Sequence, residues 1–451
     1  MSNQLPLRSA AYDIFHEALR AVDASTAVEK SVRLTESDVI VCDERFALDQ
    51  IHRIYAIAIG KAALPMAIAL EDTVDNLFAE GFIAGPIAGQ LSGKIATPPR
   101  KLSTRLRWCE GGHPLPTNAS LVAAQSAFSL LERANAEQSL VIFLISGGGS
   151  AMFEWPISED ITLANLRTAN RALISCGASI SEVNAVRRAF SAVKGGRLSS
   201  FAPKSRQLTL IVSDVPNGEE HNVASGPTLP PPADSSSARE VVARYELAKQ
   251  LPFSIMRAIE EAPSAFNDSR GDRHKHFVVL NNDMALDSAA KAARERGFIT
   301  EIARDITDNP IAVGCEKLLA QLDDLQRRNP DAEVCVISGG EFACPVRGDG
   351  VGGRNSESAL RLAMTVDKDR CGEFVALCAG TDGIDGNSTA AGAIADGRTM
   401  GRARAMFREP SHFLDNSDSA SLFIALEDAI ETGLTGTNAR DLRVLLSAPH
   451  K

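Results

Sequence analysis

The sequence is short of aromatic side chains, of long apolar stretches and of positive charge, and each shortage excludes a class of protein. Aromatic residues make up 5% of the 451 residues, too few for the stacking platforms of proteins that bind single-stranded nucleic acid. No stretch of roughly 18 uninterrupted apolar residues occurs, so no segment is expected to span a membrane. The 47 Lys and Arg residues are outnumbered by 57 Asp and Glu, and the net charge of −10 argues against a nucleic-acid-binding surface.

Cysteine is present at eight positions, but no pair has the C-x-x-C spacing and no Cys/His cluster has the spacing of a zinc site. Several cysteines lie within apolar runs, where a free thiol behaves as a small hydrophobic group and suits a reducing compartment. The first residues lack the basic-then-apolar pattern of a secretory signal peptide. With ordinary fractions of hydrophobic (44%) and charged (23%) residues, these features predict a cytoplasmic globular protein.

Apolar runs and amphipathic segments alternate along the chain, which is typical of an α/β fold. The runs expected to form strands are 54–60, 139–145, 208–214, 276–280, 298–303, 333–338 and 373–380. Because these runs are apolar throughout, we expect mainly parallel sheets that helices cover on both faces. A polar stretch near 265–275 predicts two α/β domains, comprising residues 1–268 and 269–451.

The segment SGGGS follows an apolar run and carries the strongest local signal for a ligand site. Consecutive glycines let a backbone approach a ligand closely, and amides at the start of a helix attract anions. We therefore expect this loop to bind phosphate through Ser146, Gly147, Gly148, Gly149 and Ser150. A tight strand-to-helix turn is the alternative interpretation of this segment. The sequence contains no G-x-x-x-x-G-K-[ST] motif, so a P-loop nucleotide site is not expected.

Cationic residues beside glycines form a second set of candidates. Lys61 follows the run 54–60, where the carboxyl end of a parallel strand opens onto a ligand-binding crevice. In the segment NAVRRAFSAVKGGR, Arg187 and Lys194 are seven residues apart and share one face of the expected helix. Solvent-exposed helix charges followed by a glycine C-cap are the alternative interpretation of this segment.

A glycine-rich loop in the second half of the chain precedes an arginine. Gly348, Gly350 and Gly353 match the G-x-G-x-x-G pattern of dinucleotide sites, but Pro345 makes the preceding segment a poor strand. Arg354 follows at the expected start of a helix, where the helix dipole disfavours a cation. That local conflict favours a functional role for Arg354 over an ordinary surface position.

Three aspartates at turns offer oxygen ligands for Mg²⁺ or a proton acceptor. Asp214 ends the run 208–214, and Asp382 and Asp385 lie among glycines in GTDGIDG. Because Asp and Gly dominate turns for conformational reasons, an ordinary loop is the alternative at each position.

Taken together, the motifs resemble those of the glycerate 2-kinase family. The following segments occur in the order seen in that family: IGKAA, GGHPLPTNAS, SGGGSA, NAVRRAFSAVKGGRL, SDVPNG…ASGPT, SGGE, GGRNSESAL, GTDGIDGNSTAAGA and TGTNARDL. The resemblance covers nearly the whole chain. It departs after SDV, where the family commonly has a Gly-Asp-Asp-like run and this sequence has Asn217-Gly218-Glu219-Glu220.

The resemblance implies an N-terminal kinase domain and a C-terminal MOFRL domain, both α/β, with the active site in the cleft between them. It implies ATP-dependent phosphorylation of D-glycerate at its 2-hydroxyl, with Mg²⁺, to give 2-phosphoglycerate. It also implies that Lys61 and Arg354 are catalytically important, because they match a lysine and an arginine of the family's motifs.

Phosphoryl transfer requires mainly positioning and neutralisation of charge, and the motifs supply groups for both. We expect the SGGGS amides to cradle the ATP phosphates, Lys61 and Lys194 to neutralise them, and Arg354 to stabilise the transferring phosphoryl group. Gly195, in the KGGR segment, and Glu341, in the SGGE segment, are further candidates for the nucleotide site.

The acidic candidates and the remaining cations complete the expected site. Asp214 or Asp382 is expected to hold Mg²⁺ or to accept the hydroxyl proton, and Asp385 is a further candidate metal ligand. The candidates for binding glycerate, with an arginine on its carboxylate, are Asn184, Arg187 and Arg197.

Two other functions remain open on the sequence alone. An NAD(P)H-dependent hydroxypyruvate reductase has superficial support from the G-x-G-x-x-G match, and members of the family have been labelled that way. A non-catalytic sugar-acid-binding protein would be expected to lack charges such as Lys61 and Arg354. The expected partner is a small-molecule substrate, and we expect binding neither to nucleic acid nor to a membrane. The sequence does not determine the oligomeric state, and a homodimer is one possibility.

Overall fold

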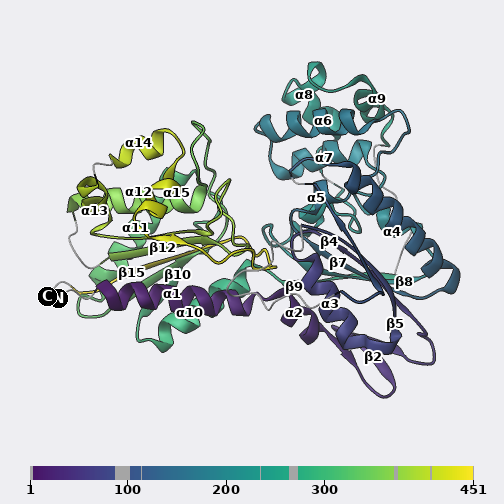
Figure 1. Ribbon diagram of the computed structural model, residues 1–451, viewed down its shortest axis with the longest axis horizontal. Coiled ribbons are helices and arrows are strands. Elements are labelled where there is room, and N and C mark those ends of the chain that lie inside the picture. The colour runs from purple at the N-terminus through teal and green to yellow at the C-terminus, as the bar shows by residue number, and fades with distance from the viewer. Residues whose placement is uncertain are drawn as a thin grey trace. The chain divides into compact units, whose positions relative to one another are not determined.

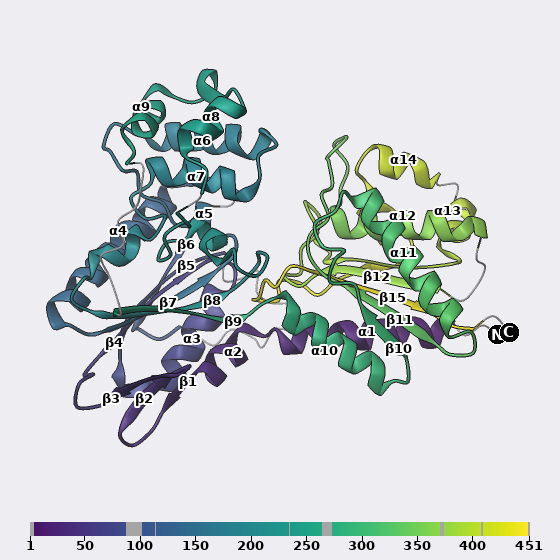
Figure 2. The ribbon, with the colours of Figure 1, turned by 180° about the vertical axis from the view of Figure 1, so that it is seen from behind.

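The computed structural model describes residues 4–86, 102–112, 114–233, 235–263, 273–369, 374–406 and 409–449, and its elements are labelled in Figures 1 and 2. These residues divide into two compact units, one spanning 24–280 and the other combining the residues up to 23 with those from 281 onward. The expected boundary between residues 268 and 269 lies outside the described residues. Among the described helices, none has the length and apolar character needed to cross a bilayer.

The first unit is built on a six-stranded sheet in the order β6-β5-β4-β7-β8-β9, in which every neighbouring pair is parallel. Its strands are β4 (Ile54–Ile59), β5 (Phe78–Gly85), β6 (Leu106–Glu110), β7 (Leu140–Ser146), β8 (Arg206–Val212) and β9 (His274–Leu280). β4 and β7 are buried along their whole length, as their continuous apolar sequences predict. Strand order runs outward in both directions from the β4–β7 pair, so the ligand-binding switch point of such sheets falls between them.

Helices surround this sheet and also form a separate layer at one end of the unit (Figures 1 and 2). They are α2 (Ala24–Ser31), α3 (Ala63–Val74), α4 (Asn118–Glu137), α5 (Gly149–Met152), α6 (Leu163–Ser175), α7 (Ile180–Phe190), α8 (Ala238–Arg244) and α9 (Phe253–Glu261), with 3₁₀ turns η1 (Asp75–Leu77), η3 (Arg197–Phe201), η4 (Glu220–Ser225) and η5 (Leu247–Lys249). Helices α6 to α9 share an apolar core of their own that includes Leu166, Val186, Val241 and Ile255. This layer supplies α7, the helix that carries Asn184 and Arg187, whereas the third predicted glycerate residue, Arg197, begins η3.

A small antiparallel sheet, which the sequence patterns did not predict, also belongs to the first unit. It consists of β1 (Val32–Leu34), β2 (Asp38–Val41) and β3 (Glu44–Ala47). Its strands are three or four residues long, too short to leave a clear alternation of apolar and polar residues.

The second unit contains a six-stranded sheet in the order β10-β11-β15-β12-β13-β14. Its strands are β10 (Ile299–Ile302), β11 (Val334–Ser338), β12 (Phe374–Gly380), β13 (Gly392–Asp396), β14 (Ala429–Ile430) and β15 (Asp441–Ser447). The α/β class is confirmed in both units. The expectation of parallel pairing holds for the first sheet, whereas the second is mixed, because β15 inserts antiparallel between β11 and β12 and only β10–β11 is a parallel pair.

The helices of the second unit lie on both faces of this sheet (Figures 1 and 2). They are α1 (Gln4–Ala21), α10 (Asn282–Glu295), α11 (Ile311–Arg328), α12 (Arg354–Asp369), α13 (Thr399–Ala405), α14 (Pro410–Asp415) and α15 (Ser419–Ala425). Helix α1 packs against α10, β12 and β15, although it begins the chain. The N-terminal helix is therefore part of the C-terminal unit, and the division between units follows β9, which completes the first sheet.

Candidate active site

Lys61 and the SGGGS loop meet at the carboxyl ends of the two central strands of the first unit. Lys61 follows β4 and the loop follows β7, its hydrogen-bonded neighbour. The Lys61 backbone N–H donates to the carbonyl of Gly147 at 2.9 Å, and the Ala62 N–H donates to Ser146 Oγ at 3.0 Å. The sheet topology thus brings together a lysine and a glycine loop that are separated by more than 80 residues in the chain.

The glycines of this junction are required by close approach and by backbone conformation. Gly60 has a φ of +112°, and a Cβ there would lie 2.3 Å from the carbonyl oxygen of Ser146. Gly148 has a φ of +80°, and a Cβ there would lie 3.0 Å from Lys61 Cγ. Gly149 begins α5, where a side chain would meet Ile59 at 2.7 Å. A bare backbone at the start of a helix is the geometry in which main-chain amides bind anions.

A chain of hydrogen bonds connects the loop to the predicted substrate arginine on α7. Ser150 Oγ and Ser225 Oγ are 2.8 Å apart, and Ser225 Oγ donates to Asn184 Oδ1 at 2.7 Å. Arg187 Nη1 donates to the same Asn184 oxygen at 3.4 Å, and its Nε donates to Asn170 Oδ1 at 2.9 Å. The structure therefore joins Ser150, a predicted phosphate ligand, to Asn184 and Arg187, two predicted glycerate ligands, through one chain of hydrogen bonds.

The segment that supplies Ser225 has an unusual backbone. Ala224 and Ser225 both have positive φ, +50° and +64°, which costs about 1–2 kcal/mol for each residue that carries a Cβ. A Cβ on Gly149 would lie 2.8 Å from the Cβ of Ala224, so this segment packs directly on the loop. Strain of this kind is concentrated at functional sites, where the surrounding structure maintains it.

Lys194 lies in the interior of the unit and not at the loop surface. Its side chain is 2% exposed, and Nζ lies 2.5 Å from Glu154 Oε2. Glu154 Oε1 also accepts hydrogen bonds from Ser191 Oγ at 2.5 Å and from the Trp155 N–H at 2.9 Å. Burial lowers the pKa of Lys194, and the Glu154 carboxylate opposes that effect. Lys194 therefore has a buried acidic partner that the sequence patterns did not reveal.

The glycines that follow Lys194 pair with the backbone around Ser225. The Gly195 N–H donates to the Ser225 carbonyl at 3.2 Å, and the Gly196 N–H donates to the Gly226 carbonyl at 2.7 Å. Gly195 has a φ of +63°, and a Cβ there would lie 2.7 Å from Cδ of Arg188. These glycines join two loops and leave room for Arg188.

The three arginines at the end of α7 and just beyond it differ in what their guanidinium groups contact. Arg197 Nη1 donates to the carbonyls of Arg188 and Ser191. Arg188 was not singled out from the sequence, yet its buried Nη1 has no hydrogen-bond partner among the described residues. Burial lowers the pKa of Arg187 and of Arg188 to about 10, so both remain charged at neutral pH.

Asp214 lies at the same edge of the first sheet as the loop. It follows β8, which pairs in parallel with β7, and the preceding Ser213 N–H donates to the Leu280 carbonyl at 2.8 Å. The carboxyl edge of this sheet thus carries Lys61, the SGGGS loop and Asp214 on three strands that are consecutive in the sheet. That is the edge where ligands bind in doubly wound sheets.

Arg354 lies in a cluster of charged groups in the second unit. It begins α12, and its Nε donates to Asp441 Oδ2 at 2.6 Å while Nη2 lies 2.8 Å from Glu341 Oε1. Burial lowers the pKa of Arg354, but the carboxylates of Asp441 and Glu341 outweigh it and raise the pKa overall. Asn355 Nδ2 donates to the other oxygen of Asp441 at 2.9 Å. Asp441 begins β15, and only its place in the TGTNARDL motif could have drawn attention to it.

Asp382 and Asp385, which are neighbours in sequence, have different environments. Asp382 Oδ1 accepts from the Ile384 N–H at 3.1 Å, and a Cβ on Gly380 would lie 3.0 Å from this oxygen and 3.5 Å from Asp441 Oδ1. Asp382 therefore lies beside the Arg354–Asp441 cluster. Among the described residues, no group of three or more His, Cys, Asp or Glu side chains is arranged to hold a metal ion by itself.

Asp385 caps the start of α12. Its Oδ1 accepts from the Asn355 N–H at 2.9 Å, and its Oδ2 accepts from the Ser356 N–H at 2.8 Å and from Ser356 Oγ at 2.6 Å. Burial raises the pKa of Asp385, and these three donors oppose that effect. Asp385 satisfies amides that the first turn of a helix leaves without partners.

The G-x-G-x-x-G match does not form a dinucleotide-binding turn. Residues 339–353 contain no strand. Gly348 and Gly350 pack against Asn416 and Asp418, where Cβ atoms would lie 2.1 Å from Asn416 Oδ1 and 2.4 Å from Asp418 Cβ. These glycines serve packing against the segment between α14 and α15.

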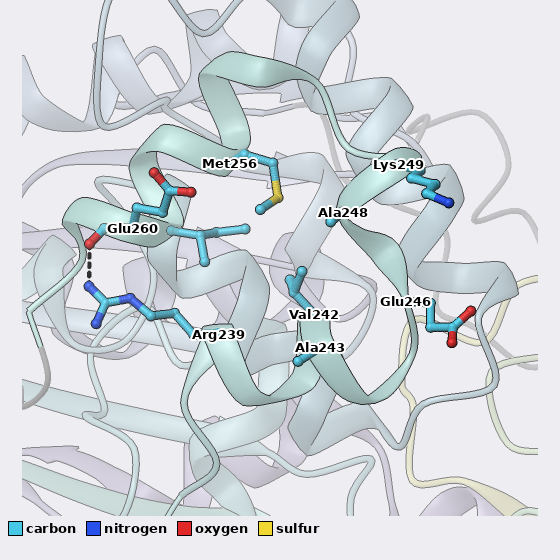
Figure 3. Close-up of a pocket in the computed structure, with 9 residues that line it drawn as sticks. Arg239, Val242, Ala243, Glu246, Ala248, Lys249, Met256 and Glu260 are labelled. Carbon is cyan, nitrogen blue, oxygen red and sulfur yellow. Dashed lines mark hydrogen bonds between the residues drawn. The ribbon is translucent and has the colours of Figure 1, made fainter.

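A pocket of about 550 Å³ lies between α8 and α9, and Figure 3 shows the residues that line it. Arg239 donates across it to the main-chain carbonyl of Glu260. The lining residues are Arg239, Val242, Ala243, Glu246, Ala248, Lys249, Met256, Ile259 and Glu260. None of the residues predicted from the sequence is among them, so this pocket is distinct from the candidate active site.

Comparison with known proteins gives matches over nearly the whole chain. The family DUF4147, a domain of unknown function, matches residues 10–260, and the MOFRL family matches residues 334–441. A D-glycerate 2-kinase of Thermotoga maritima is 31% identical, over 97% of this chain and 97% of that protein. A putative hydroxypyruvate reductase of Agrobacterium vitis is 34% identical, over 87% of this chain and 99% of that protein. The crystal structure of a glycerate kinase from Thermotoga maritima matches with a TM-score of 0.78 and 28% identity, over 98% of this chain and 100% of that one.

Proposed function

The chain belongs to the glycerate 2-kinase family, and on that premise we propose that it transfers the γ-phosphoryl group of ATP to the 2-hydroxyl of D-glycerate. The observation that carries the proposal is the contact between Lys61 and the SGGGS loop at the switch point of the first sheet. A kinase needs a cation beside a phosphate-binding backbone, and this junction supplies both.

The loop amides and Lys61 are assigned to the phosphates of ATP. Gly148 and Gly149 place main-chain N–H groups at the start of α5, and the positively charged side chain of Lys61 lies beside Gly148. Lys194, which was expected to neutralise the ATP phosphates, is instead assigned to holding the loop that contains it in position, because its ammonium is buried against Glu154. Gly195 is likewise assigned to the shape of the loop through its hydrogen bond to Ser225.

The acidic groups fit a magnesium ion, which prefers oxygen ligands and commonly shares them with substrate phosphates. Asp214 or Asp382 would hold it, and Glu341, which lies beside Arg354 in the same unit as Asp382, is a further oxygen donor. Bound Mg²⁺ would neutralise charge on the phosphates. Asp385 is left out of this set, because its two oxygens already accept three hydrogen bonds at the start of α12.

Arg187 is assigned to the carboxylate of glycerate in preference to Arg197. Asn170 and Asn184 hold its Nε and Nη1, which leaves Nη2 for a ligand. Arg197 Nη1 is instead used by two main-chain carbonyls. Through Asn184 and Ser225, Arg187 is connected to Ser150 of the phosphate loop, so both substrates would be held by one hydrogen-bonded network.

In the proposed reaction, the 2-hydroxyl oxygen of glycerate forms a bond to the γ-phosphorus while the bond from that phosphorus to the β–γ bridging oxygen breaks. ADP leaves with the electron pair, and the hydroxyl proton passes to Asp214 or Asp382. Arg354 is assigned to the negative charge of the transferring phosphoryl group. Its pairs with Asp441 and Glu341 keep it charged and fix its orientation.

The proposal is tested by incubating the purified protein with ATP, Mg²⁺ and D-glycerate, measuring ADP release, and separating 2- from 3-phosphoglycerate. L-glycerate serves as the control substrate. Formation of 2-phosphoglycerate that depends on D-glycerate is the expected result. ATP-dependent heat stabilisation without turnover would instead favour a binding protein.

Hydroxypyruvate reduction is kept as the second candidate, because the relative from Agrobacterium vitis carries that name. It is tested by mixing the protein with NADH or NADPH and hydroxypyruvate and following the nicotinamide absorbance. We expect no oxidation of either nucleotide, because the G-x-G-x-x-G segment here follows no strand.

A further inference from the structure

A basic pocket lies at the opposite end of the first sheet from the glycine loop. Its volume is about 520 Å³, and its lining includes the first residues of β8 and a residue of β9. The strands are parallel, so their amino ends lie at one edge and the candidate active site at the other. β8 has seven residues, which at the usual rise separates the two edges by about 20 Å.

The charges that line this pocket are strongly unbalanced. Among the described residues that line it, Lys204, Arg206, Arg273 and Lys275 are opposed by one carboxylate, that of Glu44. Lys275 Nζ lies 2.5 Å from Glu44 Oε1, which leaves the other three cations without an acidic partner among the lining residues. This concentration of positive charge occurs in a chain whose net charge is −10.

The two arginines are held in place by contacts that do not neutralise them. The Arg206 guanidinium lies over the ring of Phe46, 5.6 Å from its centroid, and Arg273 Nη1 donates to the Pro203 carbonyl at 3.4 Å. Such contacts orient a guanidinium and leave its remaining N–H groups for an anion.

The pocket between α8 and α9 provides an internal comparison. It has a similar volume, about 550 Å³, but Arg239 and Lys249 are matched there by Glu246 and Glu260. A concave surface lined by one sign of charge concentrates the opposite counter-ion, whereas a balanced one does not. The imbalance is therefore a property of the basic pocket in particular.

We propose that this pocket binds a small phosphorylated molecule that carries at least two negative charges. Its volume lies within the range of small-molecule sites, and arginine forks match the geometry of phosphate oxygens. Gln50 and Gln138 also line the pocket, and amide side chains can donate hydrogen bonds to the oxygens of such a ligand. The site is separate from the proposed ATP site and does not depend on the proposed function.

The test uses inorganic pyrophosphate as the probe and a full-length Lys61→Ala/Arg354→Ala variant, so that the proposed catalytic cations cannot account for binding. Isothermal titration calorimetry should show saturable binding of one pyrophosphate per chain. Adding Arg206→Gln and Arg273→Gln should weaken that binding by at least about tenfold, since a charge-assisted hydrogen bond is worth a factor of that order. Absence of saturable binding before these two substitutions would overturn the proposal.

The matched control removes the same amount of charge from exposed arginines of the other unit. Arg20 and Arg327 are 70% and 73% exposed, and each pairs with an acidic residue on its own helix. Arg20→Gln/Arg327→Gln should leave pyrophosphate binding unchanged, and an equal weakening would overturn the proposal by showing a general effect of net charge. Lys204→Gln is a second variant that keeps the fold, because the backbone N–H of Lys204, and not its ammonium, bonds Asn135. It too should weaken binding, and unchanged affinity in both pocket variants would refute the site.

Discussion

Gly148→Ala tests the contact between the glycine loop and Lys61 with a single added methyl group. Gly148 has a φ of +80°, so a Cβ there costs about 1–2 kcal/mol in backbone strain. The same Cβ would lie 3.0 Å from Lys61 Cγ, closer than ordinary van der Waals contact, so the lysine stem must move. A displacement of a fraction of an ångström in a positioning group reduces kcat/KM by about tenfold, given that about 1 Å can cost 100-fold.

Gly177→Ala is the matched control for this substitution. Gly177 has a φ of +79°, and a Cβ there would meet nothing within 4 Å. Both variants should therefore lose a similar free energy of unfolding, measured by urea denaturation, because they carry the same backbone penalty. In an ADP-release assay with varied ATP, only Gly148→Ala should lose activity. Wild-type kcat/KM in Gly148→Ala, or an equal loss in Gly177→Ala, would refute the assignment of the loop and Lys61 to ATP.

Three further predictions concern the ion pairs and the cap around the site. Lys194→Met should lower the free energy of unfolding, measured by urea denaturation, by about 3–5 kcal/mol, because it leaves Glu154 as a buried charge without a partner. The double variant Lys194→Met/Glu154→Gln should recover most of that free energy in the same measurement. Arg354→Ala should lower kcat far more than it raises KM for either substrate in steady-state assays, and a change in KM alone would remove it from the transition state. The Ser179 N–H helps hold the pKa of Glu182 at about 2, below its ordinary 4.5. The ionised carboxylate therefore stabilises the fold above pH 4.5, and this contribution is lost as the pH falls towards 2. In acid titrations followed by circular dichroism, Glu182→Gln should lose less stability over this pH range than the wild type.

The first sheet could be predicted from the sequence because its central strands are apolar along their whole length. β4 and β7 are buried throughout, and this is the pattern that predicts a parallel sheet covered on both faces. The second sheet could not be predicted in the same way. β15 begins about 60 residues after the end of β12, yet it lies between β11 and β12 in the sheet. Nothing in the local sequence of β15 specifies an antiparallel partner.

The same distinction applies to the candidate site. Lys61 and the SGGGS loop each follow an apolar strand, so topology alone predicts that they share an edge of the sheet. The partners of Lys194 and Arg354 could not be predicted, because Glu154 and Asp441 lie 40 and 87 residues away from them. The capping role of Asp385 also depends on contacts between distant segments, and a motif rich in Asp and Gly does not distinguish a cap from a metal ligand.

The most direct test of the central claim is the product formed from ATP and D-glycerate by the wild-type chain and by Lys61→Ala, measured side by side. The wild-type chain should produce 2-phosphoglycerate, and Lys61→Ala should produce it far more slowly while retaining the urea midpoint of the wild type. Formation of 3-phosphoglycerate by the wild-type chain, or an undiminished rate of 2-phosphoglycerate formation in Lys61→Ala, would contradict the account.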